Sequence, residues 1–202
     1  MKDIETYNIC FLGQTGFGKS SLINELFGTV FNTDPLVSCT KELYSVSKLI
    51  ETSEGERLVT VYDTPGIGEF STNEKYQVYY DYAASVADHI VLVVSLDRVD
   101  ATSQDLLESI SKYIKGDHVK FTIALNRIDS TGVMDDVDYI SWDTKNNKPS
   151  ERCMKKINAR RKTIIANYLD DIDFLPFEII PVCAIRKYGI SELRNRLYMN
   201  HI

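Results

Sequence analysis

Residues 13–20, with the sequence GQTGFGKS, have the residue types and the spacing of a loop that binds phosphate. The glycines let the backbone curl so that successive N–H groups point at the β- and γ-phosphates of a nucleotide. A helix that begins at Lys19 adds the positive end of its dipole. Lys19 can reach the phosphate oxygens as a point charge, and the Ser20 hydroxyl can ligate Mg²⁺. The loop therefore predicts a site for a nucleoside triphosphate.

A second set of residues could hold the metal ion and sense the terminal phosphate. Asp63 ends the apolar run 58–63 and opens the segment DTPG, so its carboxylate emerges at a strand end and can hold Mg²⁺ through water. Thr40, earlier in the chain, is expected to join Ser20 on the ion in the triphosphate state. The N–H of Gly66 could sense the γ-phosphate. The glycines and the proline after Asp63 predict a loop that acts as a switch.

The base would be read by two further segments, each of which follows an apolar run. In the sequence NRID, Asn126 and Asp129 are placed so that the carboxylate can accept both the ring N–H and the exocyclic amine of guanine, a pair of donors that adenine lacks. Arg127 could lie on the base plane. In the sequence Cys183-Ala184-Ile185, the Ala184 N–H could donate to the guanine oxygen. These segments favour GTP over ATP.

The site prediction assigns these residues three roles. The catalytic residues are Lys19, Thr40 and Gly66, and the Mg²⁺ ligands are Ser20, Thr40 and Asp63. The predicted nucleotide contacts are Gly13, Gln14, Thr15, Gly16, Phe17, Gly18, Lys19, Ser20, Ser21, Asn126, Arg127, Asp129, Cys183, Ala184 and Ile185.

With these five segments in this order, the chain resembles an Era-like small GTPase domain of the P-loop (TRAFAC) GTPases. Trp142-Asp143, Asn147, Pro149 and Ser150 also resemble the bacterial YfjP-type proteins. The resemblance implies a GTP-binding molecular switch that hydrolyses GTP to GDP and phosphate with Mg²⁺. It also implies the Ras-like P-loop GTPase fold.

Departures from the family pattern bear on how water would be activated. Arg127 stands where the family usually has Lys, and Cys183 stands where it commonly has Ser. Ile67 stands where Ras-like enzymes carry the Gln that orients water, and Gly16 stands where several Era-like relatives carry an Asn that helps to hold potassium. We therefore expect slow hydrolysis by the isolated monomer. The missing group would come from a nucleotide-dependent homodimer or from an activating protein.

The elements that must position these residues alternate along the chain. The apolar runs predict an α/β protein with three layers, in which helices cover both faces of a mostly parallel six-stranded sheet. One GTPase domain is expected over residues 1–202. The predicted strands are 7–12, 43–50, 57–62, 90–95, 119–125 and 177–182, and the predicted helices are 19–27, 74–87, 103–115, 151–169 and 191–198.

Composition limits the partners that the chain could have. A net charge of −6 is not the positive charge that general nucleic-acid binding requires, so overall charge supports neither an RNA nor a membrane contact. No apolar run approaches a membrane span, and the N-terminus lacks a signal-peptide core. The four cysteines include no CxxC pair. A cytoplasmic location is therefore expected.

Two predicted helices carry surfaces that could meet a partner. The helix 74–87 holds more tyrosines than one inward stripe needs, so one or two could form a nucleotide-dependent interface beside the switch. The helix after residue 150 carries a basic face, for which a solvated surface is the simpler interpretation. Its residues are Arg152, Lys155, Lys156, Arg160, Arg161 and Lys162.

Two alternative functions remain open from the sequence. One is the G domain of a dynamin-like or immunity-related membrane-associated GTPase, against which the absence of a long helical stalk after the last helix counts. The other is a module that binds GTP without hydrolysing it, since no side chain is clearly placed to orient water.

Substitution of the base-reading carboxylate gives the first test. Asp129→Asn should lose affinity for GTP and gain affinity for xanthosine triphosphate, whose base has an acceptor in place of the amine. Competition binding with the two nucleotides measures the exchange. Unchanged GTP affinity without a xanthosine preference would remove Asp129 from the base site.

Overall fold

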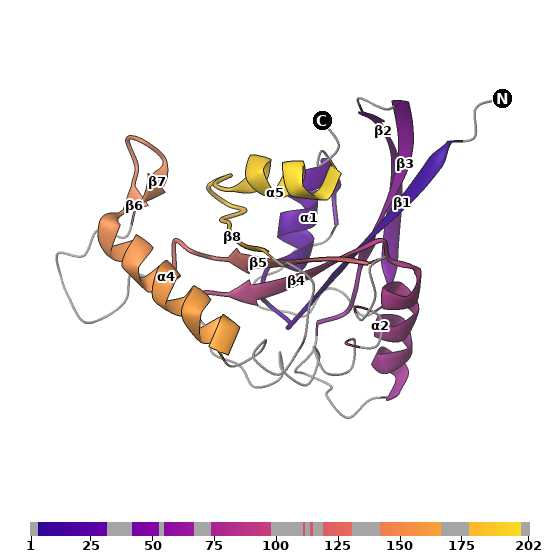
Figure 1. Cartoon of the computed structure of the whole chain (residues 1–202), viewed down its shortest axis with the longest axis horizontal. Coiled ribbons are helices and arrows are strands. Elements are labelled where there is room, and N and C mark those ends of the chain that lie inside the picture. Colours follow the sequence, from indigo (N-terminus) through magenta and orange to yellow (C-terminus); the bar gives the residue numbers. More distant parts are fainter. Residues whose placement is uncertain are drawn as a thin grey trace.

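The computed structural model describes residues 4–31, 42–52, 55–66, 74–97, 111, 114, 119–130, 142–166 and 178–198. Within these residues, six strands form one sheet in the order β2-β3-β1-β4-β5-β8, and two short strands form a separate hairpin (Figure 1). The sheet strands are β1 (Glu5–Gly13), β2 (Tyr44–Thr52), β3 (Gly55–Asp63), β4 (His89–Ser95), β5 (Lys120–Asn126) and β8 (Glu178–Pro181). The hairpin strands are β6 (Trp142–Asp143) and β7 (Lys148–Pro149), and the helices are α1 (Lys19–Phe27), α2 (Glu74–Val86), α4 (Glu151–Ile164) and α5 (Ile190–Tyr198).

The central strands β1, β4 and β5 run parallel to one another and are rich in apolar residues, as expected for parallel strands that are covered on both faces. Every residue of β4 is buried, and so are six of the seven residues of β5. Within the described six-stranded sheet, β2 alone runs antiparallel to its neighbour, β3. The register pairs Phe11 with Asp63, Gly13 with Val93, and Ser95 with Asn126, so the carboxyl ends of four strands meet at one edge. Ligands of open α/β sheets bind at such an edge.

Alternation along the strands divides the core into two layers. Ile9 and Phe11 of β1 belong to a cluster that includes the inner side chains of α1 and α5. Cys10 and Leu12 point to the other face and belong to a cluster with α2 and α4. Figure 1 shows α1 and α5 on one side of the sheet and α2 and α4 on the other. The prediction of a three-layer α/β fold with a mostly parallel six-stranded sheet is confirmed.

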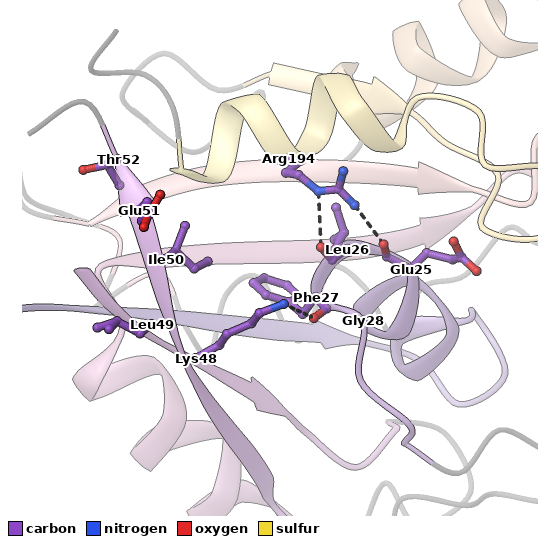
Figure 2. A pocket seen from close by; sticks show the side chains of 10 residues that line it. All are labelled: Glu25, Leu26, Phe27, Gly28, Lys48, Leu49, Ile50, Glu51, Thr52 and Arg194. Atoms are coloured by element: carbon purple, nitrogen blue, oxygen red, sulfur yellow. Dashed lines mark hydrogen bonds between the residues drawn. The ribbon is translucent and has the colours of Figure 1, made fainter. Parts of the chain in front are cut away.

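The C-terminal end of α1 is held by cations from two other elements. Arg194 of α5 donates to the carbonyl oxygens of Glu25 and Leu26 over 3.0 and 3.2 Å, and Lys48 of β2 donates to that of Phe27 over 3.3 Å. Figure 2 shows these contacts in the wall of a pocket of about 440 Å³ between α1, β2 and α5. Cations are favourable at the last carbonyls of a helix. They fix α1, whose opposite end begins at Lys19.

Several element boundaries differ from the sequence prediction. The β6–β7 hairpin was not predicted, because strands of two residues are too short to show a period. The α-helix α4 ends at Ile164, whereas the predicted helix runs to residue 169, and its last three residues lie outside the described part of the chain. The predicted helix 103–115 also lies outside it, except that residues 111 and 114 are helical. No helix among the described residues is long and apolar enough to cross a membrane.

The basic face of α4 is smaller than the sequence indicated. Arg160 is only 7% exposed and lies on the inner side with Cys153, Ile157 and Ile164. The prediction that Arg160 belongs to the basic face is therefore wrong, because its place in the helical period matches the buried stripe. The helix begins where Ser150 accepts a hydrogen bond from the N–H of Cys153.

His89 is the buried imidazole at the start of β4. Its Nε2 lies 2.9 Å from the Thr122 hydroxyl and its Nδ1 lies 3.3 Å from the Tyr7 hydroxyl. Burial lowers the pKa of His89 from 6.5 to about 3, and the positive charges of Lys120 and Arg196 add to the effect. The imidazole is therefore neutral in the folded protein at neutral pH.

This buried imidazole makes stability depend on pH in a defined window. Between pH 6.5 and about 3, the unfolded state binds a proton on His89 that the folded state does not bind, so the free energy of unfolding falls as the pH falls. Between pH 7 and pH 5, His89 lowers the free energy of unfolding by up to about 2 kcal/mol. His89→Gln should lack this component when urea unfolding is measured at both pH values. An equal loss in wild type and variant would contradict it.

Candidate functional site

The loop between β1 and α1 follows a path that requires glycine. Gly13, Gly16 and Gly18 have φ angles of 144°, 77° and 86°. A Cβ on Gly13 would lie 2.4 Å from the carbonyl oxygen of Val93, so the loop passes directly against the end of β4. The three glycines therefore allow both the curl of the loop and its close approach to the sheet.

Lys19 closes this loop from inside. Its side chain is buried, and its Nζ donates to the carbonyl oxygens of Gly13 and Gln14 over 2.9 and 3.1 Å. Burial lowers the pKa of Lys19 to about 8, while the negative charge of Asp63 opposes the shift. A buried cation inside a curled backbone forms a cradle for an anion such as a nucleotide phosphate.

The predicted metal ligands Ser20 and Asp63 meet in the structure. The Ser20 hydroxyl donates to Asp63 Oδ2 over 2.6 Å, and Thr64 holds the end of β3 by donating to the carbonyl oxygen of Phe11 over 2.8 Å. A hydroxyl and a carboxylate are hard oxygen ligands that suit Mg²⁺, which usually takes few protein ligands and adds phosphate oxygens and water. The described residues contain no group of three His, Cys, Asp or Glu side chains that could hold a metal without a nucleotide. Thr40 lies outside the described residues.

The DTPG segment lies directly on the phosphate loop. A Cβ on Gly66 would lie 2.2 Å from Thr15 Oγ1 and 2.4 Å from its backbone N, so only glycine fits there. Tyr80 of α2 is buried and donates to the Pro65 carbonyl oxygen over 3.0 Å. Helix α2 is therefore connected to the position where a γ-phosphate would be sensed. Ile67 lies outside the described residues.

Asn126 connects the base-reading segment to the phosphate loop. Its Nδ2 donates to the carbonyl oxygen of Phe17 over 2.9 Å, and its side chain is buried. Its Oδ1 is buried and has no hydrogen-bond partner among the described residues. One end of the amide thus braces the loop, and the other remains to accept a hydrogen bond.

Asp129 and the segment 183–185 lie together at the end of β5. The carboxylate of Asp129 contacts the side chain of Cys183 and forms an ion pair with Arg186, with Nε 3.1 Å from Oδ2. Ala184 is buried, whereas Ile185 is 88% exposed. Arg127 has a φ of 56°, which turns the chain between the two base-reading residues.

The structure brings the predicted phosphate, metal and base residues within its described part to one edge of the sheet; Thr40 is not among the described residues. Sequence reasoning missed Arg186 and Tyr80. Arg186 was missed because it pairs with a residue 57 positions away, and Tyr80 was considered only as one of several tyrosines. A phosphate cradle, a hydroxyl–carboxylate pair and a guanine-type carboxylate on this fold define a guanine nucleotide-binding protein of the P-loop class.

Comparison with known proteins gives the family. The family model described as 50S ribosome-binding GTPase matches residues 8–127, and the chain belongs to this family. Neuronal-specific septin-3 of Danio rerio is 39% identical over 75 residues, which are 34% of this chain and 21% of the septin. Septin-12 of Rattus norvegicus is 38% identical over 81 residues, which are 37% of this chain and 23% of the septin. The matches therefore span less than a quarter of these relatives.

A solved structure of Era in complex with MgGDPNP and nucleotides 1506–1542 of 16S ribosomal RNA shares the fold. The TM-score is 0.63 and the identity is 18%, over 96% of this chain and 56% of the Era chain. Together with the family match over residues 8–127, this shared fold confirms the resemblance to Era-like P-loop GTPases.

Two glycines that flank α1 provide a matched test of the site. Gly18 and Gly28 both have positive φ, but a Cβ on Gly18 would lie 2.6 Å from Asn126 Nδ2, whereas a Cβ on Gly28 would meet nothing within 4 Å. Gly18→Ala and Gly28→Ala should each lose about 1 kcal/mol or more of stability from backbone strain. Only Gly18→Ala should also lose GDP affinity, by tenfold or more, because Asn126 must leave Phe17. Urea unfolding and GDP titration measure the two effects, and equal GDP affinities would contradict the role of Asn126 as a brace.

Proposed function

We propose that the chain binds GTP and hydrolyses it to GDP and phosphate with Mg²⁺, and that it acts as a molecular switch. The observation that carries this proposal is the convergence of Lys19, the Ser20–Asp63 pair and Asp129 at one sheet edge. Each of these groups matches a different part of a guanine nucleotide. The membership of the GTPase family supports the same function.

The chain's own residues would bind and orient the nucleotide. The loop N–H groups and Lys19 would hold the β- and γ-phosphates, and Ser20 and Asp63, with Thr40, would hold Mg²⁺. The ion would neutralise charge that develops on the phosphate oxygens. Asp129 would accept the two donors of guanine, and Asn126 would keep the phosphate loop at a fixed distance from the base.

The switch would act through the contact between Gly66 and Thr15. A γ-phosphate bound at this position would meet the Gly66 backbone, and Tyr80 connects the neighbouring Pro65 carbonyl to α2. Tyr82 of the same helix is 53% exposed and packs edge to face with Tyr62. The surface of α2 is therefore where a second copy of the chain or an activating protein would read the nucleotide state.

Phosphate release under multiple turnover tests the proposed hydrolysis. Lys19→Ala, which lacks the cation of the phosphate loop, should release no phosphate above background. A wild-type protein that binds GTP as tightly as GDP but releases no phosphate at any concentration would be a binding module, not an enzyme.

The mode of water activation gives a separate prediction. Gly16 offers no side chain to a potassium site, and neither Gly66 nor Ile67 carries a polar side chain. Turnover per molecule should therefore rise with protein concentration or on addition of an activating protein, and it should not change when sodium replaces potassium. A group supplied in trans can be worth about 10³ to 10⁵ in rate. Brisk, concentration-independent turnover in highly dilute protein would show that one chain orients the water alone.

A further inference from the structure

Arg186 makes contacts that the proposed nucleotide chemistry does not use. Its Nε donates to Asp129 Oδ2 over 3.1 Å. Its guanidinium carbon lies 5.0 Å from the centroid of the Trp142 ring, within cation–π range. The guanidinium is thus held between the base-reading carboxylate and an aromatic ring.

The β6–β7 hairpin fixes both the side chain and the backbone of Arg186. The Trp142 Nε1 donates to Asn147 Oδ1 over 3.2 Å, and Asn147 Nδ2 donates to the carbonyl oxygen of Arg186 over 3.0 Å. The Trp142 ring is 3% exposed and packs edge to face with Tyr188, with centroids 5.4 Å apart. The hairpin therefore determines where the guanidinium lies.

Asp129 keeps acceptor capacity for guanine while it is paired with Arg186. Its second contact is the Cys183 thiol, whose pKa is raised to about 12, mainly by burial and also by Asp129. The thiol therefore stays protonated and can donate. An ionised carboxylate has about four acceptor positions, and within the described part of the chain these two donors use two of them. The remaining two match the ring N–H and the amine of guanine, so the arginine and the base can bind together.

We propose that Arg186, held by Trp142 and Asn147 of the β6–β7 hairpin, is a positioning residue that aims the Asp129 carboxylate at guanine. The inference rests on the proposed binding of guanine nucleotides at this site. On this proposal, the β6–β7 hairpin helps to select the base, although no residue of the hairpin is predicted to contact the nucleotide.

Equilibrium titration of the full chain with GDP and with inosine diphosphate tests this role. Inosine lacks the exocyclic amine, so it makes only one of the two contacts with Asp129. Arg186→Ala should weaken GDP binding about tenfold, the scale of a charge-assisted hydrogen bond, and weaken inosine diphosphate binding less. The ratio of the affinity for GDP to the affinity for inosine diphosphate should therefore be smaller than in the wild-type protein. Arg186→Lys keeps the charge but lacks the planar fork, so its preference should be intermediate.

Two controls separate positioning from general damage. Lys187→Ala removes the adjacent cation, which is 72% exposed and pairs with Glu25 over 3.2 Å, and it should leave the preference unchanged. In an Asp129→Ala background, Arg186→Ala should add no further loss, because the two residues act on the base as one unit.

Several results would overturn the inference. Tighter GDP binding by Arg186→Ala would show that the arginine competes with the base. An unchanged preference for GDP over inosine diphosphate in both Arg186 variants would show that Arg186 does not act on the base. If Arg186→Ala does not fold, the preference of Arg186→Lys alone tests the inference. If the wild-type protein binds GDP but the Arg186 variants keep its preference for GDP, the inference fails and the proposed function still stands. Wild-type protein that binds no GDP would overturn both.

Discussion

The parallel register of β1, β3, β4 and β5 is the constraint on which the candidate site depends. It ends four strands at one edge, and three of these ends each deliver a group: the phosphate loop after Gly13, the carboxylate of Asp63, and the base-reading segment after Asn126. A slip of one residue between neighbouring strands would turn every side chain of the slipped strand to the other face and displace the groups. Burial of β4 on both faces makes such a slip costly, because it would disturb both cores at once.

The sequence predicted those parts of the site whose chemistry depends on residues that follow one another closely along the chain. Lys19 and Ser20 must follow the glycines directly, since the loop and the helix start form one continuous segment. Contacts between distant segments leave no such pattern. The cation–π contact of Arg186 with Trp142 joins a turn to a hairpin of two-residue strands, and neither residue stands in a motif that the nucleotide requires. Asn126 was identified in the correct segment, but its hydrogen bond to Phe17 depends on how β5 and the loop lie in space.

The architecture was predicted well, whereas several boundaries of its elements were not. Long apolar runs such as those of β4 and β5 can be satisfied only between two covered faces, which indicates the layered α/β architecture. Boundaries depend on weaker local effects. Helix α1 begins and ends where predicted because Gly18 and Gly28, which flank it, both have a positive φ. The end of α4 has no such signal, and the cap at Ile165 is still in a right-handed helical conformation.

Strand β2 has a consequence for the association of this protein with itself. Among the described strands it stands at the end of the sheet order, and with nine residues it is far longer than β8 at the opposite end. A long outer strand presents a row of backbone donors and acceptors that could template unwanted pairing. The exposed Lys48 and Glu51 side chains place charges along it, and such charges oppose edge-to-edge aggregation. Replacing Glu51 with an apolar residue should reduce solubility before it affects nucleotide chemistry.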